Sequence, residues 1–309
     1  MPVDSKLRRA GLFFAVGPLR TGSSLMARCI DDHPAAICLC ESEINRALFR
    51  DHFLELHCER MVKHGLTLHE AVRFIDRKKQ NDISSWLEWY SQVAVRLSVL
   101  YEKRYLPAFG EKSPDLSQSP ELVEFMADNF PLIYTVRDPR AIYRSIDVQD
   151  DASPELKAER WDSLVQNYLA WKPFLNEPNL LVVRYEDLLT DPIETMYKVY
   201  EHLDLPRSLR FLDPFPRHFP RRFLWKTAVA WESGVNRDFD PSRIGSWKST
   251  LAPDQLELIY SNPAVVEFME RFGYARPDCP GQVANSPDAR DVNASIGSVV
   301  SHACAVAVD

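Results

Sequence analysis

The stretch from Phe13 to Pro34 reads Phe-Phe-Ala-Val-Gly-Pro-Leu-Arg-Thr-Gly-Ser-Ser-Leu-Met-Ala-Arg-Cys-Ile-Asp-Asp-His-Pro. The apolar run Leu12 to Val16 has the length of a buried strand, a loop bounded by Gly17 and Gly22 follows, and a helix can continue from Ser23. Such an arrangement holds phosphate because loop N–H groups and the helix N-terminus gather partial positive charge. Four side chains of this loop could donate hydrogen bonds to the same anion: Arg20, Thr21, Ser23 and Ser24.

This loop departs from the P-loop pattern at one position. The pattern G-x-x-x-x-G-K-S/T has its glycines at Gly17 and Gly22, but Ser23 stands where the lysine is required. Kinases and ATPases with this loop use that lysine on the β- and γ-phosphates, whereas the cation here comes earlier, at Arg20. The loop therefore favours phosphate binding over a plain strand-to-helix turn, and it disfavours ATP chemistry.

The rest of the chain alternates apolar runs with helical patterns. The runs predict four further strands, at Ala35 to Leu39, Leu106 to Phe109, Leu132 to Val136 and Leu180 to Val183. Helices are expected at 44–63 and 84–104, and after the capping sequences Ser119-Pro120, Ser153-Pro154 and Asp191-Pro192. This alternation predicts an α/β protein, a P-loop-like three-layer fold with a central parallel sheet flanked by helices.

Composition limits the class of protein. We expect one domain over residues 1–275 and a disordered tail over 276–309, where periodicity ends. A net charge of -7 argues against a nucleic-acid partner, so an anionic ligand needs a local arginine cluster. The six cysteines fit neither a disulfide framework nor a metal site. No apolar run has the length of a transmembrane segment or of a signal peptide, so a cytoplasmic protein is expected.

Charged residues also follow the later strands. Val136-Arg137-Asp138-Pro139-Arg140 leaves a buried strand, where Arg137 needs either an anion or a carboxylate such as Asp138. An arginine with the hydroxyl of Ser145, two helical turns further on, suits a phosphate monoester. The charges of Arg184-Tyr185-Glu186-Asp187-Leu188 can pair locally, which favours a structural role. The chain therefore has two separated candidate anion sites, whereas a simple nucleotide kinase needs one.

With the late segment Arg243-Ile244-Gly245-Ser246-Trp247-Lys248, these stretches resemble the PAPS-dependent sulfotransferases, which use 3′-phosphoadenosine 5′-phosphosulfate (PAPS) as donor. Their order and spacing agree over roughly residues 10–275. The resemblance implies that Gly17 to Ser24 bind the 5′-phosphosulfate and that Arg137 and Ser145 bind the 3′-phosphate. It also implies that Arg243 and Gly245 belong to a segment closing over that phosphate, and that no metal takes part.

Locally the chain is most similar to the tyrosylprotein sulfotransferases, in Arg20 to Met26, in Asp31 to Pro34 and in the acids near Glu41. That similarity implies Glu41 as catalytic base, with Arg20 and Lys112 as cations that stabilise the transferred group. Glu43 is the rival base, and an ion pair between Glu41 and Arg46 is the structural alternative. A histidine is the second choice of base, although His33 is expected to cap a helix and the histidines between residues 52 and 69 to face solvent.

The expected activity is in-line transfer of a sulfuryl group from PAPS to a hydroxyl or amine. The acceptor stays open among sugars, glycolipids, small molecules and peptide hydroxyls. Its contacts are expected between residues 44 and 104 and in a lid over 207–240. The alternatives are a P-loop kinase that uses ATP-Mg²⁺ and a non-catalytic nucleotide-binding protein of the same fold.

Overall fold

The computed structural model describes residues 11–42, 54–72, 83–103, 106–113, 120–148, 153–213 and 239–274. The predicted disordered tail, the Ser119 cap and most of the expected lid lie outside these residues. Within them, no helix is both apolar enough and long enough to cross a bilayer.

The strands form one parallel sheet. They are β1 (Leu12–Val16), β2 (Ala36–Cys40), β3 (Ala108–Lys112), β4 (Leu132–Val136) and β5 (Leu180–Arg184). Their order is β2-β3-β1-β4-β5, and each neighbouring pair is parallel. The parallel α/β class predicted from the alternating pattern is confirmed. Since the chain steps from β1 to one side of the sheet and later to the other, β1 lies at a topological switch point.

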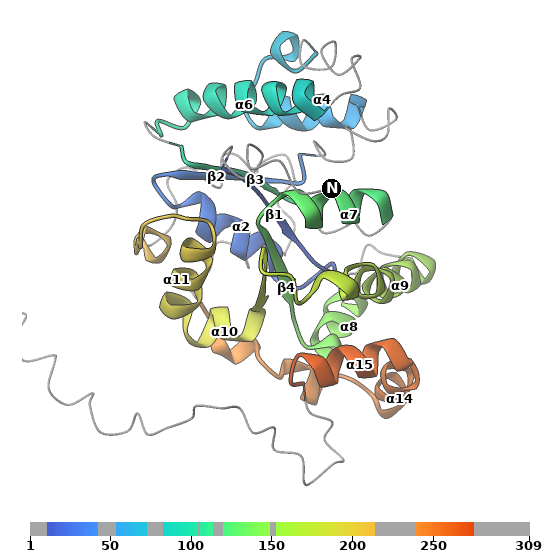
Figure 1. The fold of residues 1–309 in the computed structure, drawn as a ribbon. Helices are drawn as coiled ribbons and strands as arrows, with labels where there is room; N and C mark the ends of the chain where they lie inside the picture. The colour runs from blue at the N-terminus through green and yellow to red at the C-terminus, as the bar shows by residue number, and fades with distance from the viewer. Residues whose placement is uncertain are drawn as a thin grey trace, which may run out of the picture.

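Helices cover both faces of the sheet (Figure 1). One face carries α2 (Ser23–Asp31), α10 (Tyr185–Thr190) and α11 (Pro192–His202). The other carries α7 (Pro120–Asn129), α8 (Pro139–Asp147), α9 (Pro154–Trp171), α14 (Pro253–Ser261) and α15 (Pro263–Arg271). A further layer, α4 (Leu54–Lys63) with α6 (Ile83–Leu100), lies over the β2–β3 side. Short 3-10 turns occur at Lys172–Phe174, Arg210–Leu212, Pro241–Arg243 and Ser246–Ser249.

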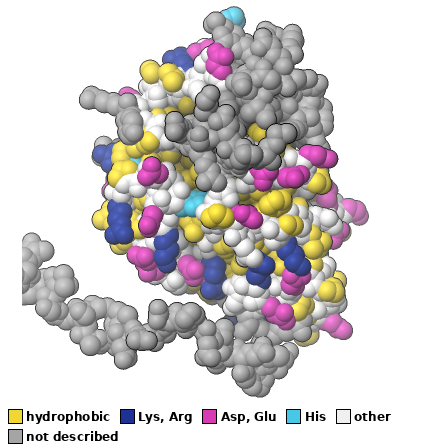
Figure 2. All heavy atoms as spheres, in the orientation of Figure 1, with side chains coloured by type: hydrophobic (Ala, Val, Ile, Leu, Met, Phe, Trp, Pro, Cys, Tyr) yellow, Lys and Arg dark blue, Asp and Glu magenta, His cyan; other side chains and the backbone are white. Residues whose placement is uncertain are grey.

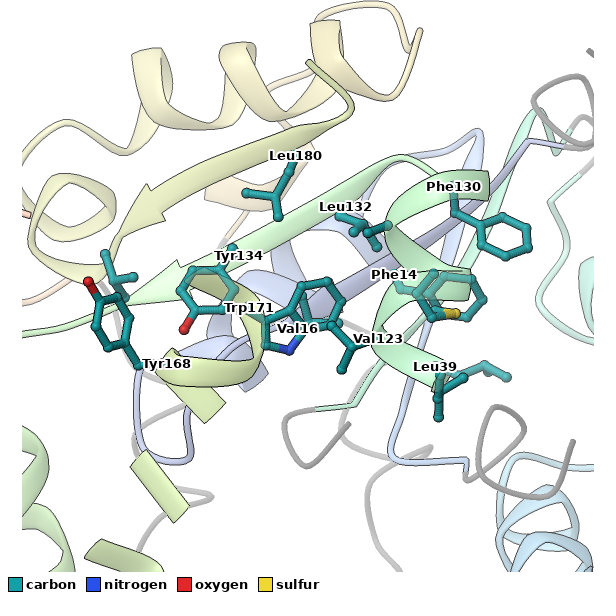
Figure 3. Packing of buried hydrophobic residues seen from close by; sticks show 14 of the residues in the cluster. Phe14, Val16, Leu39, Val123, Phe130, Leu132, Tyr134, Tyr168, Trp171 and Leu180 are labelled. Carbon is teal, nitrogen blue, oxygen red and sulfur yellow. The ribbon is translucent and has the colours of Figure 1, made fainter. Parts of the chain in front are cut away.

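Alternate side chains of β1 pack into two separate hydrophobic cores, one on each face of the sheet. Phe13 packs with α2 and α11, whereas Phe14 packs edge-on against Phe130, with ring centroids 5.1 Å apart. Figure 3 shows this larger core, in which Trp171 of α9 and Val123 of α7 meet the sheet. Both faces of β1 are buried, which explains why the strand is apolar throughout instead of alternating.

The element boundaries correct several expectations. The strand expected at Leu106 to Phe109 is instead β3, which runs to Lys112 because it pairs with β1 and β2 over that length. Pairing with two neighbours overrides the polar composition of its last residues. The helix expected to end at residue 104 ends at Leu100, and the helix expected from residue 44 is described only from Leu54. The caps at Ser153 and Asp191 are confirmed, since each side chain accepts a backbone N–H.

Candidate functional site

The candidate site lies along the carboxyl edge of the parallel sheet. The anion loop follows β1, Glu41 follows β2, Lys112 is the last residue of β3, and Arg137 follows β4. Because parallel strands all end at one edge, four separate stretches of sequence meet there. On the face shown in Figure 2, basic side chains are interspersed with acidic ones, and the net charge of the chain is -7.

The loop after β1 depends on two glycines. Gly17 has φ +127°, and a Cβ there would lie 2.4 Å from the Thr135 carbonyl oxygen. Gly22 has φ +83°, and its Cβ would lie 2.2 Å from the Tyr185 ring. Any larger residue would push β4 or Tyr185 away. The left-handed Gly22 then starts α2, whose first turn contains no acidic residue and offers N–H groups to an anion.

The hydroxyl side chains of this loop divide into two kinds. The Thr21 hydroxyl is buried, donates to the Pro18 carbonyl at 2.8 Å, and lies 2.8 Å from the Thr135 hydroxyl. It therefore holds the loop against β4, and its expected use as a side-chain donor to the anion stays a prediction. Ser23 is also buried, whereas Ser24 is partly exposed at the start of α2. A contact of either serine with a nucleotide stays a prediction.

Arg20 reaches from the loop to α8. Its backbone is left-handed at φ +68°, and its Nε donates to the Ser145 hydroxyl at 2.9 Å. Ser145 was expected beside Arg137, but in the structure it supports Arg20. Burial lowers the pKa of Arg20, and the charges of Arg137 and Arg160 lower it further. A buried cation beside like charges is stabilised by an anion, so this position suits a charged ligand group.

Arg137 stands at the end of β4 in the same cluster. One terminal nitrogen donates to the Arg20 carbonyl at 3.2 Å, and the guanidinium lies 4.4 Å from the centre of the Tyr185 ring. Burial lowers the pKa of Arg137 most strongly, and the nearby positive charge of Arg243 lowers it further. Arg137 and Arg243 thus provide a second region of positive charge next to Arg20.

Asp138 was the alternative to an anion as the partner of Arg137, and the structure pairs this carboxylate with another arginine. Asp138 instead forms a two-pronged ion pair with Arg140, with both N···O distances at 2.8 Å. The same carboxylate accepts the Trp247 indole N–H at 3.1 Å, and Arg140 lies 3.9 Å from the centre of the Trp247 ring. Asp138 and Arg140 therefore anchor the late segment to β4, near the left-handed Gly245 at φ +72°.

The segment after β5 is structural, as the sequence predicts. Glu186 accepts the Asp138 N–H at 3.0 Å and the Tyr274 hydroxyl at 2.8 Å. Tyr185 lies under Arg137 and against Gly22. These contacts hold the ends of β4 and β5 together beneath the arginine cluster.

Glu41 and Lys112 meet at the ends of β2 and β3. Lys112 Nζ lies 2.5 Å from Glu41 Oε1, and both side chains are mostly buried, with exposed fractions of 5% and 18%. The backbone is paired as well, because the Glu41 N–H donates to the Lys112 carbonyl at 2.8 Å. The partner expected in the alternative reading, Arg46, and the rival base Glu43 both lie outside the described residues.

His33 is held by the backbone and is poorly suited to act as a base. Its Nδ1 accepts the Ala35 N–H at 3.0 Å, which leaves Nε2 to donate to the Pro206 carbonyl at 2.8 Å. Burial lowers the pKa of His33, which favours the neutral imidazole. His64 is buried as well, which corrects its expected exposure.

Several residues of this region could not be found from the sequence. The charge of Arg160, on α9, lowers the pKa of Arg20, and Arg60 of α4 contacts Glu41. Neither belongs to a motif, and each reaches the site through the packing of its helix. Among the described residues, His, Cys, Asp and Glu form no group that could hold a metal ion. The described cysteines, Cys29, Cys38, Cys40 and Cys58, are buried free thiols.

A family model and two solved structures that resemble this chain are all of sulfotransferases. Residues 13–208 match the model of the sulfotransferase family. The sulfotransferase domain of the olefin synthase from Synechococcus PCC 7002 is 20% identical, with a TM-score of 0.62 over 86% of this chain and 95% of that domain. The sulfotransferase domain from the curacin biosynthetic pathway is 18% identical, with a TM-score of 0.61 over 87% of this chain and 100% of that domain. At these identities the likeness concerns the fold. A comparison with curated proteins found no match, so the finer resemblance to tyrosylprotein sulfotransferases receives no support.

Proposed function

The chain belongs to the sulfotransferase family, and we propose that it transfers a sulfuryl group from PAPS to a hydroxyl or amine. The observation that carries this proposal is the pairing of two cationic regions at one sheet edge. Arg20 and the start of α2 form the first, and Arg137 with Arg243 forms the second. A donor with phosphate at both ends of its nucleoside needs two such regions, whereas the phosphate chain of ATP lies on one side of the nucleoside.

In the proposed reaction, Glu41 takes the acceptor proton while the acceptor oxygen or nitrogen forms a bond to sulfur. The bond between sulfur and the bridging oxygen of PAPS breaks, and adenosine 3′,5′-bisphosphate leaves with the electron pair. Arg20 and Lys112 would stabilise the negative charge that develops on the oxygens. In the unliganded protein Lys112 neutralises Glu41 at 2.5 Å, so Lys112 is already placed beside the base.

The acceptor side of the site would be the layer formed by α4 and α6. Glu41 contacts this layer through Arg60 of α4, while the anion loop lies toward α8 through Arg20 and Ser145. Donor and acceptor would thus approach Glu41 and Arg20 from different elements, as an in-line transfer requires. The chemical class of the acceptor stays open among sugar, lipid-linked, small-molecule and peptide hydroxyls and amines.

Calorimetric titration with adenosine 3′,5′-bisphosphate and, separately, with ATP-Mg²⁺ tests the donor assignment. We expect the bisphosphate to bind more tightly, and Arg137→Ala to weaken its binding by roughly thirty- to a thousandfold, or about 2 to 4 kcal/mol. Arg271→Ala is the matched control. Arg271 is an exposed arginine at the end of α15, and it donates to Asn176 at 2.7 Å. A preference for ATP-Mg²⁺, or equal effects of the two substitutions, would overturn the proposal.

A further inference from the structure

We propose that Arg60 is a positioning residue for Glu41, through which helix α4 sets the orientation of the base. The catalytic meaning of this inference rests on the proposed function, in which Glu41 removes the acceptor proton. The contact itself is independent of that function. Arg60 belongs to none of the sequence motifs at this site.

Two residues contact Glu41 at both its backbone and its side chain. Lys112 accepts the Glu41 N–H at 2.8 Å through its carbonyl and places Nζ 2.5 Å from Oε1. Arg60 mirrors this arrangement from the other side. Its NH1 donates to the Glu41 carbonyl at 2.5 Å and lies 3.8 Å from Oε2. Each polar group of Glu41 thus has Lys112 or Arg60 beside it.

The backbone conformation of Glu41 explains why these contacts are needed. Glu41 has φ +52°, a left-handed backbone that is strained for a residue with a side chain. Arg60 binds the carbonyl of Glu41 itself. Arg60 therefore stabilises the backbone conformation from which the carboxylate extends, as well as facing the carboxylate itself.

The two holding residues come from parts of the fold with different roles. Lys112 is part of the sheet, fixed by pairing of β3 with both neighbours. Arg60 is on α4, which packs on the core through Cys58 and Met61 and belongs to the layer proposed for the acceptor. A change in the position of α4 would move Arg60 while Lys112 stays in place. The base is thereby set jointly by the donor-side sheet and the acceptor-side helix.

Electrostatics make the contact measurable. Lys112 of β3 and Arg60 of α4 both face the Glu41 carboxylate, with exposed side-chain fractions of 5% and 16%. Charges this well shielded from solvent act on a neighbour more strongly than surface pairs do. Removing Arg60 takes away one of the positive charges that favour the ionised carboxylate, so the measured pKa of Glu41 should rise.

The test is a ¹³C NMR titration of the Glu41 carboxyl carbon in the full chain, assigned by its loss in Glu41→Gln. We expect Arg60→Ala to raise the Glu41 pKa by about half a unit to one unit or more over wild type, and Arg60→Lys to restore part of the difference. Arg96→Ala is the matched control, because Arg96 pairs with Glu70 at 2.6 Å in the same helical layer.

Equal pKa values in wild type and Arg60→Ala, or an equal rise in Arg96→Ala, would overturn the proposal. If Arg60→Ala does not fold, Arg60→Gln carries the same expectation with a closer match in size. The titration contains no nucleotide, so its result is separate from that of the bisphosphate experiment. A pKa rise without bisphosphate binding would retain the Arg60 contact and reject the proposed donor.

Discussion

Arg20 Nε lies 2.9 Å from the hydroxyl oxygen of Ser145, although the two residues are 125 positions apart. This bond joins the loop after β1 to helix α8 after β4. Arg137 closes the same cluster by donating to the Arg20 carbonyl at 3.2 Å. The two cationic regions are therefore parts of one connected site, and a change in one should affect the other.

Ser145→Ala should weaken binding of adenosine 3′,5′-bisphosphate by roughly two- to tenfold, because it removes one hydrogen bond that orients a charged side chain. Calorimetry on the folded variant gives the measurement. Ser163→Ala is the matched control, since the Ser163 hydroxyl donates to a backbone carbonyl within α9 at 2.8 Å. Similar losses in both variants would mean that Ser145 has no special role in the site.

Gly22→Ala should lower both the melting temperature and the affinity for the bisphosphate. The added Cβ would meet the Tyr185 ring at 2.2 Å, and the left-handed backbone would add strain. Gly273→Ala separates these causes, because Gly273 has φ +74° with nothing within 4 Å of the added Cβ. We expect Gly273→Ala to cost about 1 kcal/mol from the backbone and Gly22→Ala clearly more. Equal unfolding free energies would show that Tyr185 yields without cost.

Asp138→Asn should release the late segment from β4. The substitution removes the charge that pairs with Arg140 at 2.8 Å and weakens the bond from Trp247. Breaking one side of a buried pair costs about 3 kcal/mol or more, so we expect reduced thermal stability and weaker bisphosphate binding. Asp187→Asn is the control, because its pairing with Arg184 is longer at 3.8 Å and more exposed. An unchanged affinity in Asp138→Asn would show that Trp247 is not needed for binding.

The parts of this site that the sequence predicted correctly are those set by local pattern. The strand β1, the glycines of its loop and the strand end at Arg137 follow from periodicity and spacing, and the parallel sheet places them at one edge. The choice of partner could not be predicted in the same way. Asp138 lies beside Arg137 in sequence but pairs with Arg140, because α8 begins at Pro139 and Trp247 arrives from the far end of the domain.

Contacts made by residues outside the motifs could not be predicted from the sequence either. Lys112 was identified by resemblance, but its place inside β3 depends on pairing with two neighbouring strands. Arg60 reaches Glu41 only because α4 packs over the β2–β3 side of the sheet. The positive φ of Glu41 has no signal in its residue type, since such backbones are usual for glycine and for asparagine.

Asp32, at the end of α2, provides a test of how stability depends on pH that does not involve Arg20 or Arg137. Burial, together with the charge of Asp31, raises the pKa of Asp32 to about 6, although Arg28 and Lys103 oppose the shift. The folded protein thus binds this proton more tightly than the unfolded chain, whose aspartates titrate near the usual value of about 4. Unfolding free energy from this group therefore falls as the pH rises from about 4 to about 6, and the loss is complete above that range.

Asp32→Asn removes this titration. Its unfolding free energy relative to wild type should improve by about 1 to 2 kcal/mol between about pH 4.5 and about pH 8, as measured by urea unfolding at both values. The absolute difference also includes the lost bond between Arg28 and Asp32 at 3.3 Å, which is why the change with pH is the useful quantity. A difference that stays constant, or that moves against the variant as the pH rises, would show that Asp32 is charged in the folded protein throughout this range. The carboxylate would then be held by Arg28 and Lys103 strongly enough to outweigh its burial.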